Sequence, residues 1–165
     1  MKASIKKICQ TGFLTALTVA ATMIHLPIPA TNGYINAGDA IILLTAFFFG
    51  LKSAAFVGGV GSAVADIFLG YANWAPFTLV IKAAMGVAAA AIFQRDERVS
   101  LRNVAACVVA EFVMIAGYFA GALPSGGFAY AIGAVPSNVI QAIGGVLIFT
   151  ALAAALRKSG VDKLF

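Results

Sequence analysis

The stretch GSAVADIFLGYANWAPFTLVIKAAMG (61–86) consists of two apolar runs joined by a short aromatic loop. The second run contains Lys82, and no acidic residue lies within eight positions of it on either side. A lysine in such a run is costly in a bilayer unless it faces the interior of a helix bundle and meets a partner there. The stretch therefore predicts two membrane-spanning helices with a charge buried between them.

The composition of the whole chain agrees with a membrane protein. Hydrophobic residues make up 62% of the sequence, charged residues only 10%, and the mean hydropathy is +1.00. These values are far too apolar for an ordinary soluble domain. The 165 residues leave room for about six spans of roughly 20 residues and for no separate soluble domain. We expect one membrane domain over residues 1–165.

The apolar runs predict the positions of the spans. They are rich in Ala, Leu, Val and Gly and show no alternation of polar residues, which favours helices over a transmembrane barrel. The second run is short, so part of 30–37 is expected to extend it at the interface. The prediction is an all-α integral membrane protein, a compact bundle of about six transmembrane helices, with spans near 8–26, 38–51, 53–70, 75–93, 101–121 and 133–156.

The cations predict the orientation of this bundle. All of them except Lys82 fall before the first span, in alternate loops or after the last span, which is the bias of the positive-inside rule. Both termini are therefore expected in the cytoplasm, and the net charge of +5 leaves no further basic surface for nucleic acid. A signal peptide over 1–26 is the alternative for the first run. The cations on this side are Lys2, Lys6, Lys7, Lys52, Arg95, Arg98, Arg102, Arg157, Lys158 and Lys163.

The three loops on the other side carry aromatic and amide side chains with almost no charge. They are PIPATNGYINAGD (27–39), GYANWAP (70–76) and GALPSGGFAYAIGAVPSN (121–138). Aromatic faces and amides suit a flat, neutral, polar ring, although an interfacial aromatic belt would place Trp and Tyr at the same depth. The candidate residues here are Tyr34, Asn36, Tyr71, Asn73, Trp74, Tyr130 and Asn138.

Three ionisable groups lie inside the predicted spans on the outer half. From the helical rise, Asp66, Lys82 and Glu111 lie roughly 6, 10 and 15 Å below the outer ends of their helices. They could share one cavity, or Lys82 could form a purely structural ion pair with Glu111 or Asp66. Asn138 and Gln141 are three residues apart, on one face of the last span.

Small residues mark two further helix faces. Ala16 and Ala20 lie four apart in TALTVAATM (15–23), and Gly117 and Gly121 repeat the spacing in the fifth span. Such pairs let another helix approach closely, either within the bundle or from a partner protein.

Taken together, several stretches resemble the substrate-binding S components of energy-coupling factor (ECF) vitamin transporters, in particular the ECF-type riboflavin transporter S component subfamily, whose members do not all bind riboflavin. The resemblance runs over nearly the whole chain. The stretches that carry it are TALTVAATM, GYINAGDAIILLTAFFFG (33–50), GSAVADIFLGYANWAPFTLVIKAAMG (61–86), AEFVMIAGYF (110–119) and AVPSNVIQAIGG (134–145).

This resemblance implies a six-helix, non-enzymatic subunit in a prokaryotic cell membrane that captures a vitamin-like molecule from outside. It implies docking on a coupling transmembrane subunit (T component) that carries two ATPases, with Ala16 and Ala20 matching the contact motif. The first outer loop would act as a lid. ATP and Mg²⁺ would be used by the partners, and no cofactor or metal is expected in this chain, which has no G-x-x-x-x-G-K-[ST] loop. The substrate-binding candidates are Lys82, Glu111, Asn138, Gln141, Asn36, Tyr34, Trp74 and Asp66.

The identity of the ligand stays open at this stage. Without an outer cation, a neutral heterocycle is favoured over a strongly anionic substrate, so a B6 vitamer, a thiamine precursor or riboflavin would suit. One alternative is a small proton-coupled multidrug-type exporter that uses Glu111. The other is an intramembrane hydrolase, for which only serines and the single His25 are at hand, namely Ser62, Ser125 and Ser137.

Overall fold

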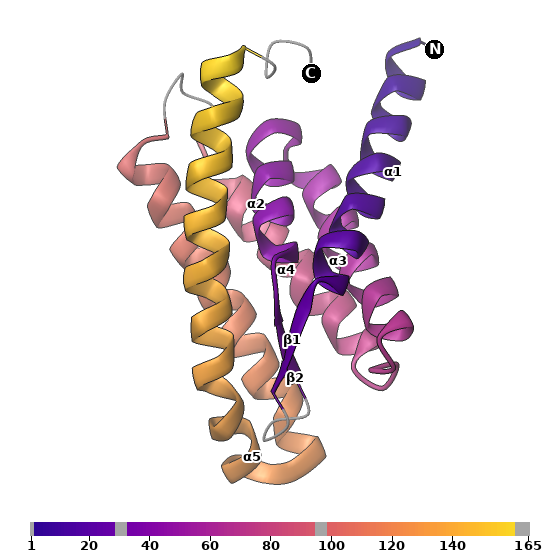
Figure 1. Ribbon diagram of the computed structural model, residues 1–165, viewed down its shortest axis with the longest axis vertical. Helices are drawn as coiled ribbons and strands as arrows, with labels where there is room; N and C mark the ends of the chain where they lie inside the picture. The colour runs from indigo at the N-terminus through magenta and orange to yellow at the C-terminus, as the bar shows by residue number, and fades with distance from the viewer. Residues whose placement is uncertain (1, 29–32, 95–98, 161–165) are drawn as a thin grey trace.

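A computed structural model describes residues 2–28, 33–94 and 99–160 of the chain. In this part the fold consists of helices and one two-stranded sheet (Figure 1). The elements are α1 (Lys2–Met23), β1 (His25–Ile28), β2 (Gly33–Asn36), α2 (Gly38–Phe49), α3 (Leu51–Phe68), α4 (Ala75–Ile92) and α5 (Leu101–Ser159).

The first outer loop contains a β-hairpin, which the all-α prediction missed. β1 and β2 pair antiparallel, with His25 opposite Asn36 and Ile28 opposite Gly33. The segment expected to lengthen the second span is therefore strand over Gly33–Asn36, and α2 starts only at Gly38. With 12 residues, α2 is about 18 Å long, too short to cross a bilayer alone. Its first turn consequently lies inside the bundle, beneath the hairpin.

The fifth and sixth predicted spans are two arms of α5. The backbone leaves helical geometry at Gly127 (φ 73°, ψ −172°), a conformation that glycine adopts without steric cost. Figure 1 shows the two arms running back along each other from this bend. The segment 121–138, which was expected to be a loop, is therefore mostly helical, and Pro124 and Pro136 lie within the arms. The number of membrane crossings stays a prediction.

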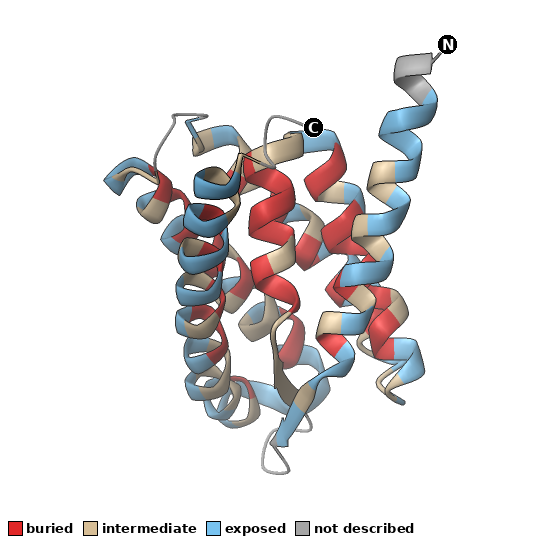
Figure 2. Ribbon diagram, turned by 45° about the horizontal axis from the view of Figure 1, so that its top comes forward, coloured by how far each residue is buried: buried red, intermediate tan, exposed pale blue. Residues whose placement is uncertain are grey.

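α2 forms the centre of the molecule. It contacts α1, α3, α4 and α5, and most of its residues are buried (Figure 2). A helix that is apolar on all sides belongs in a core, because no face of it suits water. The largest side chains of this core are Ile42, Leu43 and Phe47 on α2 itself and Met85, Met114 and Phe149 on the helices around it.

The outer surface carries many large apolar side chains. Phe68, Leu101 and Phe112 are exposed, and Figure 2 shows an exposed outer face along α5. Within the described residues, three helices are long and apolar enough to cross a membrane, namely Leu51–Phe68, Ala75–Ile92 and Leu101–Ser159. Such a surface is suited to lipid rather than to water.

α1 begins at the same end of the molecule at which α5 begins and ends, and the hairpin and the bend of α5 lie at the opposite end (Figure 1). Which side of the membrane each end faces stays a prediction. Arg95, Arg98 and Lys163 lie outside the described residues, as does the side chain of Lys2.

Glycines bring α3 and α4 into close contact. A Cβ atom on Gly58 would lie 2.6 Å from the carbonyl oxygen of Lys82, and one on Gly86 would lie 2.7 Å from the carbonyl oxygen of Ala54. Both obstacles are backbone atoms, which cannot move aside as a side chain can. The helices therefore pack backbone to backbone, and this contact fixes the position of Lys82 on α4.

We expect Gly86→Ala to destabilise the protein by about 1–3 kcal/mol, because the added methyl group forces α3 and α4 apart. Gly144→Ala is the matched control, since a Cβ at Gly144 meets no atom within 4 Å. Thermal unfolding in detergent, followed by circular dichroism, measures both variants. Equal midpoints for the two would show that the α3–α4 contact is not tight.

Candidate functional site

A cavity lies between the hairpin and helices α1, α3, α4 and α5, at the end of the molecule away from the start of α1. Its volume is about 70 Å³. Hydroxyls, amides, two charged groups and aromatic rings all face it. The lining residues are Thr22, Tyr34, Asn36, Ser62, Asp66, Tyr71, Trp74, Thr78, Lys82, Tyr118, Tyr130, Ala134, Ser137, Asn138 and Gln141.

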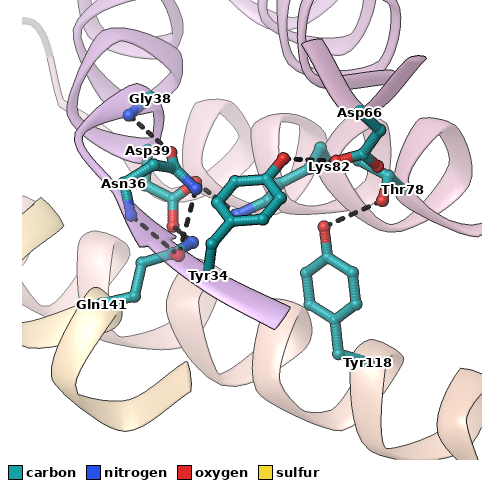
Figure 3. A network of polar contacts seen from close by, with 9 residues as sticks. All are labelled: Tyr34, Asn36, Gly38, Asp39, Asp66, Thr78, Lys82, Tyr118 and Gln141. Carbon is teal, nitrogen blue, oxygen red and sulfur yellow. Dashed lines mark hydrogen bonds and ion pairs between the residues drawn. The ribbon is translucent and has the colours of Figure 1, made fainter. Parts of the chain in front are cut away.

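Lys82 forms a buried ion pair with Asp39 (Figure 3). The two side chains are only 3% and 1% exposed. The predicted pairing with Glu111 or Asp66 is therefore wrong. The physical reason is the short α2, which places Asp39 in its first turn at the depth of Lys82 rather than at the interface. A carboxylate is also favoured there because it lies at the positive end of the helix dipole.

Gln141 connects this ion pair to the hairpin. Its Nε2 donates to Asp39 Oδ2 at 2.6 Å, and its Oε1 accepts from the Nδ2 and the backbone N–H of Asn36 at 3.1 and 3.3 Å. Asn36 Oδ1 in turn accepts from the backbone N–H of Gly38 at 2.8 Å. One network therefore joins β2, α2, α4 and the second arm of α5 (Figure 3).

Tyr34 connects the hairpin to the opposite edge of the cavity. Its hydroxyl donates to Oδ1 of Asp66 on α3. Burial, and then the neighbouring charge of Asp66, raise the pKa of the Tyr34 phenol, so it stays protonated and acts as the donor. The Tyr34 ring also packs against Tyr71 and His25, with centroids 5.0 and 5.3 Å apart.

Aromatic side chains form a further part of the cavity wall. Trp74 and Tyr118 pack edge to face at 6.0 Å, and the Tyr118 hydroxyl donates to Thr78 at 3.1 Å. Lys82 Nζ lies 5.5 Å from the centre of the Tyr118 ring, a cation–π contact. Thr78 and Tyr118 were not predicted as part of the site from the sequence. Helical spacing could have found them, because Thr78 precedes Lys82 by four residues and Tyr118 follows Glu111 by seven.

All of the substrate-binding candidates line this cavity except Glu111, and of the further candidates in the outer loops, Asn73 is exposed and does not line it. Glu111 is buried at 2% exposure, and neither carboxylate oxygen has a hydrogen-bond partner in the part of the chain that the structure describes. It lies against the backbone of α5, since a Cβ on Gly145 would come within 2.5 Å of its Oε1. Glu111 is therefore behind the cavity rather than in its wall.

The two pairs of small residues behave differently. Gly117 and Gly121 pack inside the bundle, where a Cβ would lie 2.9 Å from Ile81 and 3.3 Å from Phe77, respectively. Ala16 and Ala20 are exposed on α1. The rest of the described chain leaves these alanines exposed, so their face of α1 is open to lipid or to another protein.

Comparisons with known proteins agree with this arrangement. Residues 2–158 match the family model of the ECF-type riboflavin transporter S component. The structure resembles the S component of a bacterial ECF transporter with a TM-score of 0.76 at 20% identity, covering 94% of this chain and 97% of that one. At this identity the likeness shows the fold.

Two relatives resemble the chain over most of their length. An uncharacterized protein of Pyrococcus woesei is 38% identical over 143 residues, covering 87% of this chain and 95% of that protein. The thiamine precursor transporter HmpT of Lactococcus lactis subsp. cremoris is 29% identical over 160 residues, covering 96% and 92%.

The chain belongs to the ECF-type riboflavin transporter S component family, which confirms the resemblance inferred from sequence. It is accordingly a substrate-binding subunit of a membrane vitamin transporter and not an enzyme.

We expect Lys82→Met and Asp39→Asn each to cost about 3–5 kcal/mol of stability, because each leaves the other group buried without its partner. The double variant should lose clearly less than the sum of the two. Unfolding midpoints in detergent measure this, with Lys52→Met, at an exposed lysine, as the control. Additive losses would show that the two groups do not interact.

Proposed function

We propose that this chain captures a small heterocyclic vitamin or vitamin precursor from outside the cell membrane, as part of an ATP-driven importer. The observation that carries the proposal is the cavity beneath the hairpin, in which aromatic rings, amides and hydroxyls surround a space for a small molecule. Such a lining suits a flat polar ring. A B6 vitamer, a thiamine precursor and riboflavin are the candidates, and the likeness to a thiamine precursor transporter supports the second.

The hairpin is the proposed cover of this cavity. It contributes Tyr34 and Asn36 to the lining, and these side chains hold it to Asp66 on one side and Gln141 on the other. Breaking these few polar contacts would expose the cavity without unfolding the helices. The ligand would then enter from the hairpin end, which we place on the outer face of the membrane.

Energy would come from partner proteins. Family membership implies a coupling transmembrane subunit and two ATPases, which would use ATP and Mg²⁺. We place the contact with the coupling subunit on the exposed face of α1 that carries Ala16 and Ala20. Gly12, one turn earlier and also exposed, extends this stripe of small residues, and a Cβ there would meet nothing within 4 Å.

One observation favours a second candidate, the proton-coupled exporter. Glu111 is a buried carboxylate without a hydrogen-bond partner among the described residues, as a proton carrier would require. It does not line the cavity, however, so a proton on Glu111 would not meet the transported molecule. Transport driven by a proton gradient without ATPases, and lost in Glu111→Gln, would establish this candidate.

Native mass spectrometry of the protein purified from cells grown in rich medium tests the importer proposal directly. We expect a retained compound with the mass of a B6 vitamer, a thiamine precursor or a flavin, which is released when the protein is denatured. A protein that is empty, and that shows no thermal shift with these compounds, would contradict the proposal.

Substitution of the α1 face tests the docking surface. Ala16→Trp combined with Ala20→Trp should leave ligand binding unchanged but prevent copurification with the coupling subunit and ATPases, because the large rings block close helix contact. Ala151→Trp with Ala155→Trp is the matched control, since these alanines are exposed at the same spacing on α5. An intact complex with the α1 variant would place the partner elsewhere.

A further inference from the structure

A second hollow lies at the end of the molecule where α1 begins, away from the cavity beneath the hairpin (Figure 1). It runs between α1 and α3, which contact each other, and its volume is about 220 Å³. We propose that this α1–α3 groove binds the phosphate group of an anionic membrane lipid. The lining residues are Lys7, Ile8, Thr11, Lys52 and Ser53.

Two ammonium groups without a counter-ion line the groove. Lys7 and Lys52 are both exposed, and neither forms an ion pair within the described chain. The carboxylates of the described residues belong to Asp39, Asp66 and Glu111, which are all buried. Two like charges in one groove repel each other, so an anion bound to both lowers the free energy of the site.

The hydroxyl groups of Thr11 and Ser53 add hydrogen-bond donors to this charge. Their side-chain oxygens lie 3.4 Å apart, and Ser53 is only 4% exposed. In such a contact one hydroxyl donates to the other, so the hydrogen of the accepting hydroxyl remains for a third group. Ammonium and hydroxyl groups together suit phosphate oxygens, which only accept hydrogen bonds when ionised.

The start of α3 contributes in the same direction. Lys52 and Ser53 are the second and third residues of this helix. Its N-cap is Gly50, which has no side chain to accept from the first N–H groups, and no acidic residue lies in the first turn. The positive end of the helix dipole therefore adds to the attraction that the two lysines exert on an anion.

The size and the surroundings of the groove favour a lipid as the source of the phosphate. One water needs roughly 10–15 Å³ on this measure, so about 220 Å³ leaves room for more than an isolated ion. Ile8 and Phe56 are exposed beside it. Phe56 follows Lys52 by four residues, on the same face of α3 and one turn further from the helix start. An acyl chain could follow this face into the bilayer while its phosphate stays with the lysines.

Native mass spectrometry of the full chain, titrated with lipid in detergent, tests the proposal. The probes are dioleoylphosphatidylglycerol, which carries a net negative charge, and dioleoylphosphatidylcholine, which has the same chains and phosphate but no net charge. The wild-type protein should bind phosphatidylglycerol about tenfold more tightly, because only this headgroup leaves the two ammonium groups with a net counter-charge.

Removal of the two lysines should remove this preference. Lys7→Gln combined with Lys52→Gln should weaken the binding of phosphatidylglycerol about tenfold to thirtyfold, from the usual contribution of a lysine near an anionic headgroup. Lys6→Gln combined with Lys158→Gln is the matched control, since these exposed lysines carry the same charge but do not line the groove. The control should bind both lipids as the wild type does.

Inorganic phosphate distinguishes the two sources of the group. A large excess should displace little phosphatidylglycerol, because the free ion makes no contact with the apolar face at Phe56. Displacement at an affinity equal to that of the lipid would make the groove a site for the free ion and overturn the lipid proposal.

The remaining outcomes decide in the same way. A preference for phosphatidylglycerol that the groove variant loses and the control keeps supports the proposal. Equal binding of the two lipids by the wild type, or an equal loss in both variants, overturns it, because the charge of the whole surface would then explain the binding. If the groove variant does not fold, the wild-type comparison and the phosphate competition decide.

Discussion

The buried ion pair between Lys82 and Asp39 is the constraint on which the rest of the structure depends. Placing two charges in an apolar bundle costs several kcal/mol for each ion unless the geometry of the pair is close and its remaining polar atoms are satisfied. Here Gln141 satisfies the second oxygen of Asp39, and Tyr118 lies against the ammonium group. Groups from α2, α4 and both arms of α5 are therefore held at one depth. The ion pair lies at the inner end of the cavity, which Lys82 lines. We call this inner end the floor of the cavity.

This floor also determines where the hairpin lies. The Asn36 side chain donates a hydrogen bond to Gln141 and accepts one from the backbone N–H at the start of α2. The Tyr34 hydroxyl donates to Asp66 on α3. The hairpin, which covers the cavity, is thus hydrogen-bonded to Asp66 and Gln141, two side chains that also line the cavity. A ligand that bonded to Asp66 or Gln141 would change the contacts that hold the hairpin, so binding and the position of the cover are linked through shared partners.

The sequence predicted the helical character because hydropathy is a local property, and the resemblance of several stretches to known S components predicted the family and much of the cavity wall. The helical rise grouped Asp66, Lys82 and Glu111 at similar depths, and two of them, Asp66 and Lys82, line the cavity, whereas Glu111 does not. Asp39 was not predicted as the partner of Lys82, because α2 was expected to start near the membrane interface. At that depth Asp39 would be an ordinary loop residue. The bend at Gly127 was not predicted because 121–138 was expected to be an outer loop, whereas its two prolines, Pro124 and Pro136, lie within the arms of α5. The hairpin was not predicted because its strands have only four residues each and one of them contains Pro27.

α1 is the helix that links the cavity to the proposed partner surface. Its inner face is fixed to α3 at Gly61, where a Cβ would lie 3.0 Å from Thr18, and one turn further on Thr22 lines the cavity. The Thr22 hydroxyl is buried without a partner among the described residues, so it is available to a ligand. Ala16 and Ala20 lie on the outer face of the same rigid helix. A ligand that shifts the outer end of α1 through Thr22 or the adjoining hairpin would move this small-residue face with it. A coupling subunit bound to this face, as proposed above, would thus distinguish the loaded from the empty protein without touching the ligand.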